Sequence, residues 1–131
     1  MPGQPAAALG DRIVGIDTHI VLVPSPGGSV PTPLALPFSG TITEGCCRTV
    51  LIGGKPAATQ GSIAFNSPPH IPPTGMFKTP PTNKGTISRG SSSVFICGQP
   101  AARSGDTATT CNDIALQHSS TVVAASSVYI G

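Results

Sequence analysis

The apolar positions of this chain come in short runs rather than in long periodic stripes. Residues 20–23, 50–52 and 94–96 are such runs, and each is followed within two residues by Gly or Pro. An amphipathic helix would need apolar residues at every third or fourth position over ten or more residues, whereas short runs bounded by turn residues are typical of β-strands. The pattern therefore predicts short strands joined by tight turns.

Composition supports this prediction and limits the size of the core. The chain has 131 residues, of which 16 are Gly and 15 are Pro, and this frequency of helix-breaking residues excludes a helical bundle. Apolar residues make up 38% and the formal net charge is only +2, which is unlike the composition of disordered chains. With four Phe and one Tyr, one domain of this size buries a modest core and needs a further cross-link.

Charge and apolar segments exclude several functional classes. The seven Lys and Arg residues are scattered and form no basic patch for nucleic acid or anionic lipid. The N-terminal residues lack the pattern of a secretory signal peptide, and no apolar run is long enough to span a bilayer. We expect a protein made in the cytoplasm, whose four cysteines are free or metal-bound rather than a disulfide framework.

An eight-residue motif, Gly-x-Pro-Ala-Ala-x-x-Gly, occurs three times, at residues 3–10, 54–61 and 98–105. Three copies in so short a chain indicate one supersecondary unit used three times. Before the second and third copies, GTITEG at 40–45 matches GTISRG at 85–90, and each leads into an apolar run. The sequence of each unit therefore predicts a hairpin that ends in a Pro-Ala-Ala corner. The proline is expected at a strand end or edge, because it has no amide hydrogen to donate.

The first motif copy has no hairpin before it, but the C-terminal segments 121–123 and 126–131 supply one. When the chain is read cyclically, residues 128–131 precede the first copy much as residues 94–97 precede the third. We therefore expect the two termini to meet in space. The three units then close around a pseudo-threefold axis.

Two proline-rich stretches separate the units, at residues 24–37 and 68–81, and they hold five and six prolines. Such stretches are typical of extended surface loops, which is the prediction here, and docking to a neighbouring subunit is the alternative. They are not interdomain linkers, because the repeat continues on either side.

The third motif copy reads PAAR at residues 100–103 and continues as SGD. With its three copies, the chain resembles the PAAR-repeat family, whose members cap the spike of type VI secretion systems and related contractile injection systems. The first copy ends in Ala8 and the second in Thr59 where the third has arginine, and Ser62 replaces the aspartate that follows the motif glycine in the other two. The threefold arrangement, more than the four-letter motif, carries the resemblance.

The resemblance implies an all-β cone of short hairpins in a single domain, residues 1–131, with a zinc-stapled apex. Because the first motif begins at Gly3 and the last predicted strand ends at Gly131, we expect no fused effector domain. The base of the cone would sit on a trimeric β-helical, VgrG-like spike protein, one tip per trimer, and three internal units let one chain match a threefold partner. The implied role is structural: the tip caps and sharpens the spike for membrane puncture. It would contact the target membrane only transiently and be expelled to the extracellular space or the target cell, with effector or adaptor proteins as further partners.

The three histidines are candidates for a metal site. His19 and His70 each lie fourteen residues after the proline of their motif copy, which places them at one height around the axis. The equivalent position in the third unit is Ile114, with Cys111 before it and His118 after it. We predict a tetrahedral site formed by His19, His70, Cys111 and His118, a donor set that suits one Zn²⁺ and agrees with the histidines and cysteine that the resemblance implies. With four protein ligands the zinc would be structural rather than catalytic.

The other cysteines are predicted to be ordinary thiols. Cys97 ends an apolar run and is expected to be a small buried thiol. Cys46 and Cys47 fall at a hairpin turn and are expected to be packing or exposed thiols, with a role as metal ligands as the alternative.

Two other functions remain as alternatives. A small zinc hydrolase would need an open metal position and a nearby carboxylate base, but the chain has no His-Glu-x-x-His run and its only glutamate is Glu44. Asp11 and Asp106 follow motif glycines at matched positions, where capping of turn amides is the simpler role. The chain is therefore not expected to be an enzyme. An adaptor that tethers noncovalent effector cargo to the spike is the second alternative.

Overall fold

The computed structural model describes residues 3–113 and 119–131, and these residues form strands and turns without a helix. The strands are β1 (Gln4–Pro5), β2 (Arg12–Ser25), β3 (Gly28–Glu44), β4 (Cys47–Ile52), β5 (Lys55–Ala57), β6 (Ile63–Asn66), β7 (Met76–Phe77), β8 (Lys84–Ile87), β9 (Phe95–Ile96), β10 (Gln99–Pro100), β11 (Thr107–Thr109), β12 (Ser120–Val123) and β13 (Tyr129–Ile130). Across the described ranges nothing resembles a membrane-spanning helix. The all-β fold predicted from the short apolar runs is confirmed.

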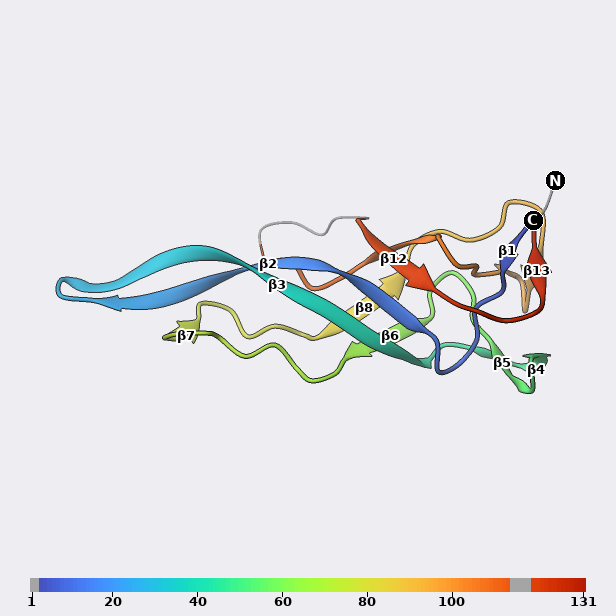
Figure 1. Cartoon of the computed structure of the whole chain (residues 1–131), viewed down its shortest axis with the longest axis horizontal. Coiled ribbons are helices and arrows are strands. Elements are labelled where there is room, and N and C mark those ends of the chain that lie inside the picture. The colour runs from blue at the N-terminus through green and yellow to red at the C-terminus, as the bar shows by residue number, and fades with distance from the viewer. Residues whose placement is uncertain (1–2, 114–118) are drawn as a thin grey trace.

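Most strands belong to one sheet that closes on itself. The order is β12-β11-β8-β6-β3-β2-β7, and β12 pairs with β2 as well, so six strands form a ring. β7 pairs with β2 at residues 21–22, farther along the strand than β12, which pairs at residues 12–14. Three short hairpins, β4–β5, β9–β10 and β13–β1, lie at the wide end of the molecule (Figure 1). Because the ring is closed, each of the six strands has a neighbouring strand on both sides where the ring forms. An open sheet would instead leave its two outermost strands with a free edge.

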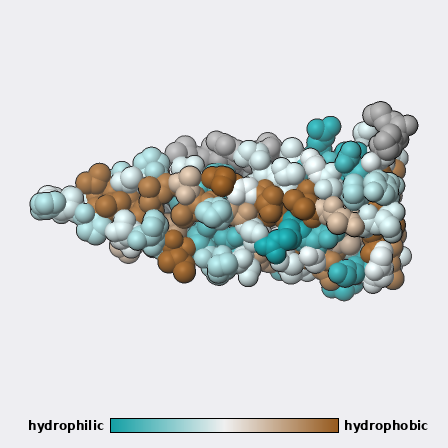
Figure 2. Space-filling model, viewed as in Figure 1, coloured by the Kyte–Doolittle hydropathy of each residue, from teal (hydrophilic) through white to brown (hydrophobic). Residues whose placement is uncertain are grey.

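The molecule is a cone whose narrow end is one long hairpin (Figures 1 and 2). Strands β2 and β3 pair without interruption from Arg12↔Thr41 to Ser25↔Gly28, far beyond the other strands. Both described ends of the chain lie at the wide end (Figure 1). The cone shape agrees with the prediction, and the narrow end is the β2–β3 turn.

The register of the three wide-end hairpins confirms the cyclic reading of the chain. Ile52 pairs with Lys55 in the second unit and Ile96 pairs with Gln99 in the third. Between the two ends of the chain, Ile130 pairs with Gln4 in the same way. The termini therefore meet in space and complete the third hairpin.

A ring of backbone hydrogen bonds joins the three motif copies at the axis. The amide of Ala7 donates to the carbonyl of Ala102 at 2.9 Å, that of Ala102 to Ala58 at 3.0 Å, and that of Ala58 to Ala7 at 3.0 Å. All three alanines are buried. Each backbone approaches the other two closely, so the Pro-Ala-Ala corner needs a side chain no larger than a methyl group at this position.

The residue after each motif glycine caps the turn, as expected. Asp11, Ser62 and Asp106 each accept a hydrogen bond from the backbone amide three residues earlier, at 2.8, 2.9 and 2.8 Å. A serine hydroxyl thus replaces the carboxylate in the second unit without loss of the bond.

The core is small and is built in threefold sets of residues. Ile42, Ile87 and Val122 form one set around the axis, with alanines filling the layers on either side. Phe38 breaks the symmetry as the largest buried side chain. A Cβ on Gly40 would lie 2.7 Å from its ring, and one on Gly85 3.1 Å, so these two glycines make room for it.

The first proline-rich stretch is not a loop, so the prediction of extended surface loops is wrong for residues 24–37. It forms the distal part of the β2–β3 hairpin. Pro31, Pro33 and Pro37 lie at alternate positions of β3, where their missing amide hydrogens leave the ladder with β2 intact. The second stretch, residues 68–81, is mostly irregular, with β7 as its only strand in the part described.

The expectation of free or metal-bound cysteines is wrong for two of the four. Cys47 and Cys97 form a disulfide, with their Cα atoms 6.1 Å apart, although the two cysteines are 50 positions apart in the sequence. Cys97 is exposed rather than buried, whereas Cys46 is a half-buried free thiol and Cys111 a buried one. Sequence spacing does not show this pairing because closure of the repeats, rather than chain proximity, brings β4 next to the β9–β10 turn.

The disulfide should contribute strongly to stability because it closes a long loop between two units. For a loop of 50 residues the entropy lost by the unfolded chain corresponds to about 4 kcal/mol. We expect Cys97→Ser to lower the free energy of unfolding by roughly that amount in urea denaturation. Cys46→Ser, which removes a free thiol, is the matched control and should change little. Equal stability of Cys97→Ser and the wild type would contradict the cross-link.

Candidate metal centre

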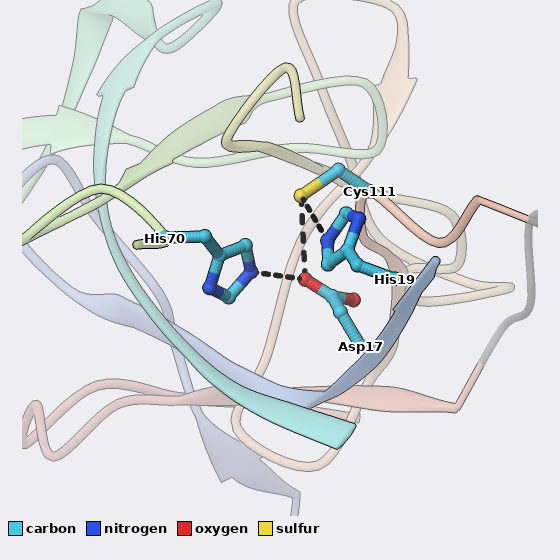
Figure 3. A group of neighbouring side chains, drawn as sticks. All are labelled: Asp17, His19, His70 and Cys111. Carbon is cyan, nitrogen blue, oxygen red and sulfur yellow. Dashed lines mark hydrogen bonds and ion pairs between the residues drawn. The ribbon is translucent and has the colours of Figure 1, made fainter. Parts of the chain in front are cut away.

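Four side chains with metal-binding atoms converge inside the ring of strands, on the side toward the narrow end of the cone. Asp17 and His19 come from β2, His70 from the segment after β6, and Cys111 from the residues after β11 (Figure 3). Their ligand atoms all lie within 4.8 Å of one another, and Asp17, His19 and Cys111 are buried. Each of the three units contributes at least one of these residues.

The structure brings together three of the four residues predicted from the sequence. His19, His70 and Cys111 meet as their matched offsets from the motif suggested. His118 lies outside the described residues. Asp17 was missed, although a signal for it exists: it stands two residues before His19, and alternate residues of a strand point to the same face.

The distances between the donor atoms suit an ion with tetrahedral coordination. Ligand bonds of about 2.0–2.3 Å at tetrahedral angles place donor atoms roughly 3.3–3.8 Å apart. The sulfur of Cys111 lies 3.3 Å from Oδ2 of Asp17 and 3.7 Å from Nε2 of His19. Nε2 of His70 is 2.9 Å from the same Asp17 oxygen, a direct hydrogen bond that is somewhat shorter than the edge of such a tetrahedron. The residues present therefore fit a small ion that takes nitrogen, sulfur and oxygen donors.

His19 is held in position by a second carboxylate. Nδ1 of His19 lies 2.9 Å from Oδ1 of Asp113, and the other oxygen of Asp113 accepts the backbone amide of Ile20 at 2.7 Å. This contact fixes the ring and leaves Nε2 facing Cys111. A carboxylate behind a metal-binding histidine is the usual support for such a ligand.

Asn66 holds the ring of His70 in position, as Asp113 does for His19. The backbone amide of Ser39 donates to Oδ1 of Asn66 at 2.8 Å, which directs the Asn66 amide nitrogen toward Nδ1 of His70 at 3.2 Å. The backbone amide of His70 in turn donates to Asn83 at 2.8 Å. Nε2 of His70 is thereby directed at Asp17.

The Asp17 carboxylate is buried but has partners for both oxygens. The hydroxyl of Thr110 donates to Oδ1, and the hydroxyls of Thr110 and Ser120 are 3.0 Å apart. Oδ2 faces His70 and Cys111. A buried carboxylate is costly unless it is paired or binds a cation, and here one oxygen is committed to the protein while the other points into the centre.

Burial raises the pKa of the Cys111 thiol to about 12, and the charge of Asp17 and its hydrogen bond with the sulfur add to the effect. The metal-free protein therefore holds Cys111 as a neutral thiol. Because a thiolate is the form that binds metal, uptake of a cation must release this proton. The same cation would offset the repulsion between the thiolate and Asp17.

The burial of Cys111 beside Asp17 predicts that its thiol titrates at an unusually high pH. In a Cys46→Ser background, where Cys111 is the one remaining free thiol, thiolate ultraviolet absorbance of metal-free protein should appear near pH 12 rather than near the ordinary value of 9.0. The folded state then binds this proton more tightly than the unfolded state, so its contribution to stability falls as the pH rises from about 9 toward 12.

Asp17→Asn should lower the pKa of Cys111, because it removes the nearby charge while burial remains. Addition of a thiophilic metal ion should produce thiolate at neutral pH. An ordinary thiol titration in metal-free protein, unchanged by Asp17→Asn, would show that these contacts do not exist.

Comparison with known proteins agrees with the repeats and the fold. None of the curated proteins compared with this chain is similar to it. The family model of the PAAR motif matches residues 37–116, more than half of the chain, including the second and third motif copies, His70 and Cys111. PAAR proteins have a structural role at the spike tip of secretion systems and associate with the spike complex. On this match, and on the threefold closure of its three motif copies, the chain belongs to the PAAR family.

Proposed function

We propose that this protein is the tip of a trimeric β-helical spike and that it docks through the wide end of the cone. One observation carries the proposal: the wide end exposes the same kind of apolar side chain three times. Leu51, Phe95 and Tyr129 are 58%, 59% and 62% exposed. They stand at matched positions of β4, β9 and β13, each paired with a motif proline.

A second set of apolar residues accompanies the first. Val50, Val94 and Val128 immediately precede the three large residues, and all three are at least partly exposed. We call these six residues the threefold base surface. Large exposed apolar side chains at symmetry-matched positions are costly in solution and favour contact with a partner. A partner with threefold symmetry would receive three equivalent contacts from a single chain.

The stoichiometry follows from this geometry. One copy of the chain presents three equivalent sites around its axis, so one copy occupies the end of one trimer. The short hairpins at the base also offer strand ends to which the β-structure of the spike could add main-chain hydrogen bonds. A VgrG-like trimer has the architecture that this surface requires.

We further propose that the centre holds one structural Zn²⁺. His19, His70 and Cys111 would be ligands, and the fourth position belongs either to Asp17, which lies beside them, or to His118, which the sequence predicts. Imidazole and thiolate donors favour zinc over magnesium or calcium, which prefer oxygen. The ion would connect all three units where the narrowing cone leaves little room for apolar packing.

The proposed role is mechanical. The spike tip would be made in the cytoplasm, assembled on the spike and expelled with it to the extracellular space or the target cell. A closed ring of strands, a metal cross-link and a disulfide give a narrow body that resists deformation. Contraction of the machine would then concentrate force on a small area for membrane puncture.

The docking proposal predicts the effect of a charge on the threefold base surface. Phe95→Asp should weaken binding to the purified trimeric spike by at least tenfold, since it buries an unpaired charge at the contact. Met76→Asp, an equally exposed apolar position at the opposite end, is the control and should bind normally. Titration calorimetry should give one chain per trimer. Unimpaired binding of Phe95→Asp would exclude the base as the docking face.

The zinc proposal predicts metal content and stability together. Elemental analysis of purified wild type should give one zinc per chain, and His70→Ala and Cys111→Ser should lose it. The loss should lower the thermal midpoint by about 10 °C or more, because structural zinc contributes several kcal/mol to a small domain. Asp17→Asn and His118→Ala identify the fourth ligand, and Cys46→Ser is the control. Wild-type protein without stoichiometric metal would refute the proposal.

A further inference from the structure

The three hairpins at the wide end (Figure 1) are not held by the same strand pairing. In the first and third units, the amide of the first motif alanine donates to a valine of the opposite strand. These two bonds are Ala6 to Val128 at 2.7 Å and Ala101 to Val94 at 2.9 Å. In the second unit the matched alanine, Ala57, pairs instead with Cys47, three residues before the matched valine. The hairpin of the second unit is therefore irregular.

The irregularity is a bulge in β4. Its pairing jumps from Cys47 to Leu51 while β5 advances by one residue, so residues 48–50 have no opposite partner in β5. All three are exposed, and Val50 belongs with Leu51 to the threefold base surface. A bulge leaves ladder positions unpaired and disrupts the hairpin locally. Strand pairing therefore fixes the second unit's part of the base surface less firmly than the other two parts.

The disulfide anchors this bulge to the neighbouring unit. Cys47 is buried at the start of the bulge, and Cys97 lies in the β9–β10 turn, two residues after Phe95. The bond thus connects the segment that carries Leu51 with the hairpin that carries Phe95. Among the three described hairpins, the one whose pairing is interrupted is the one whose outer strand is cross-linked.

Cys97 occupies a turn position that favours glycine. Its φ is 52°, and the matched residue of the second unit is Gly53, with a φ of 59°. A Cβ makes this left-handed conformation unfavourable, whereas glycine adopts it readily. The turn itself is therefore better served by glycine, and the sulfur bond is what a cysteine adds at this position.

The bond is open to thiol–disulfide exchange. Cys97 is exposed, so a thiolate in solution can attack its sulfur and displace the sulfur of Cys47. The hydroxyl of Thr49 lies 3.2 Å from the Cys47 sulfur and 3.6 Å from the Cys97 sulfur, where it can donate a hydrogen bond to the departing thiolate. The free thiol of Cys46 competes poorly, because burial raises its pKa and keeps it protonated at neutral pH.

We propose that Cys47 and Cys97 form a redox-sensitive cross-link that controls the order of the second unit's part of the threefold base surface. The disulfide form holds Val50 and Leu51 in place, and the dithiol form leaves the bulge free to move. The oxidant is a small-molecule disulfide such as oxidised glutathione. Two protein thiols and one glutathione disulfide give the protein disulfide and two glutathione thiols, so glutathione takes up the two electrons and two protons that the protein releases.

The cross-link would regulate docking. A partner must order the bulge of the dithiol form as it binds, whereas the disulfide form has this order in advance. A reducing cytoplasm would favour the dithiol form, and an oxidising exterior would favour the disulfide. This regulation rests on the proposed docking through the base, whereas the cross-link and its effect on the bulge do not.

The first experiment needs no spike. As-purified Cys46→Ser protein, in which Cys46 cannot exchange, is equilibrated in buffers of graded glutathione ratio, and its free thiols are counted by alkylation and mass spectrometry. We expect a reversible transition of two thiols. Amide hydrogen exchange of residues 47–52 should be at least tenfold faster in the reduced form, and that of the β13–β1 hairpin unchanged. Absence of the disulfide, or equal exchange of residues 47–52 in both forms, overturns the proposal.

Two variants separate the cross-link from the turn. Cys97→Ser and Cys97→Gly both remove the disulfide, so both should show the fast hydrogen exchange of residues 47–52 in every buffer. Cys97→Gly should have an unfolding equilibrium constant about fivefold smaller than that of Cys97→Ser, because glycine suits the left-handed turn. Slow exchange of residues 47–52 in either variant overturns the proposal, since neither can form the cross-link.

The second experiment measures docking of both forms to the purified trimeric spike. The disulfide form should bind about tenfold more tightly than the dithiol form, and Cys97→Gly should bind like the dithiol form in every buffer. Equal affinities would overturn the regulation and leave docking itself intact. Binding by neither form would refute docking through the base, and hydrogen exchange would still decide whether the cross-link orders the bulge.

Discussion

The ring of hydrogen bonds among Ala7, Ala58 and Ala102 is the constraint on which the rest of the fold depends. It brings three chain segments that are far apart in sequence to one axis, at a distance that only a small side chain allows. Each corner then joins a short hairpin at the base to a strand on the apex side, which is β2, β6 or β11. The threefold symmetry of the protein is thus a property of its backbone hydrogen bonds rather than of a large core.

The two ends of the cone use this symmetry differently. At the base the three units stay equivalent, and Leu51, Phe95 and Tyr129 occupy the same position in each. Toward the apex the units diverge: the first extends into the long β2–β3 hairpin, while the second and third contribute His70 and Cys111 from irregular segments. A symmetric base suits a symmetric partner. An asymmetric apex permits a mixed set of donor atoms at one point.

Stability in such a narrow molecule does not come from apolar packing alone. The buried residues near the axis are mostly alanine and β-branched, and within the described residues Phe38 is the one Phe or Tyr side chain that is buried. Cross-links between units compensate for this small core. The Cys47–Cys97 disulfide connects the second and third units near the base. The cluster of Asp17, His19, His70 and Cys111 connects all three toward the apex, where a bound cation would also offset the buried carboxylate.

The sequence by itself determined the all-β class, the three units, their cyclic closure and the meeting of the termini, because a repeated motif reports equivalence directly. It also indicated His19, His70 and Cys111 through their offsets from the motif. Only the tertiary structure decided the Cys47–Cys97 pairing, the place of Asp17 beside the histidines, and the strand conformation of the first proline-rich stretch. These features depend on which residues become neighbours across units and on which edge of its strand each proline faces. Local sequence patterns contain neither kind of information.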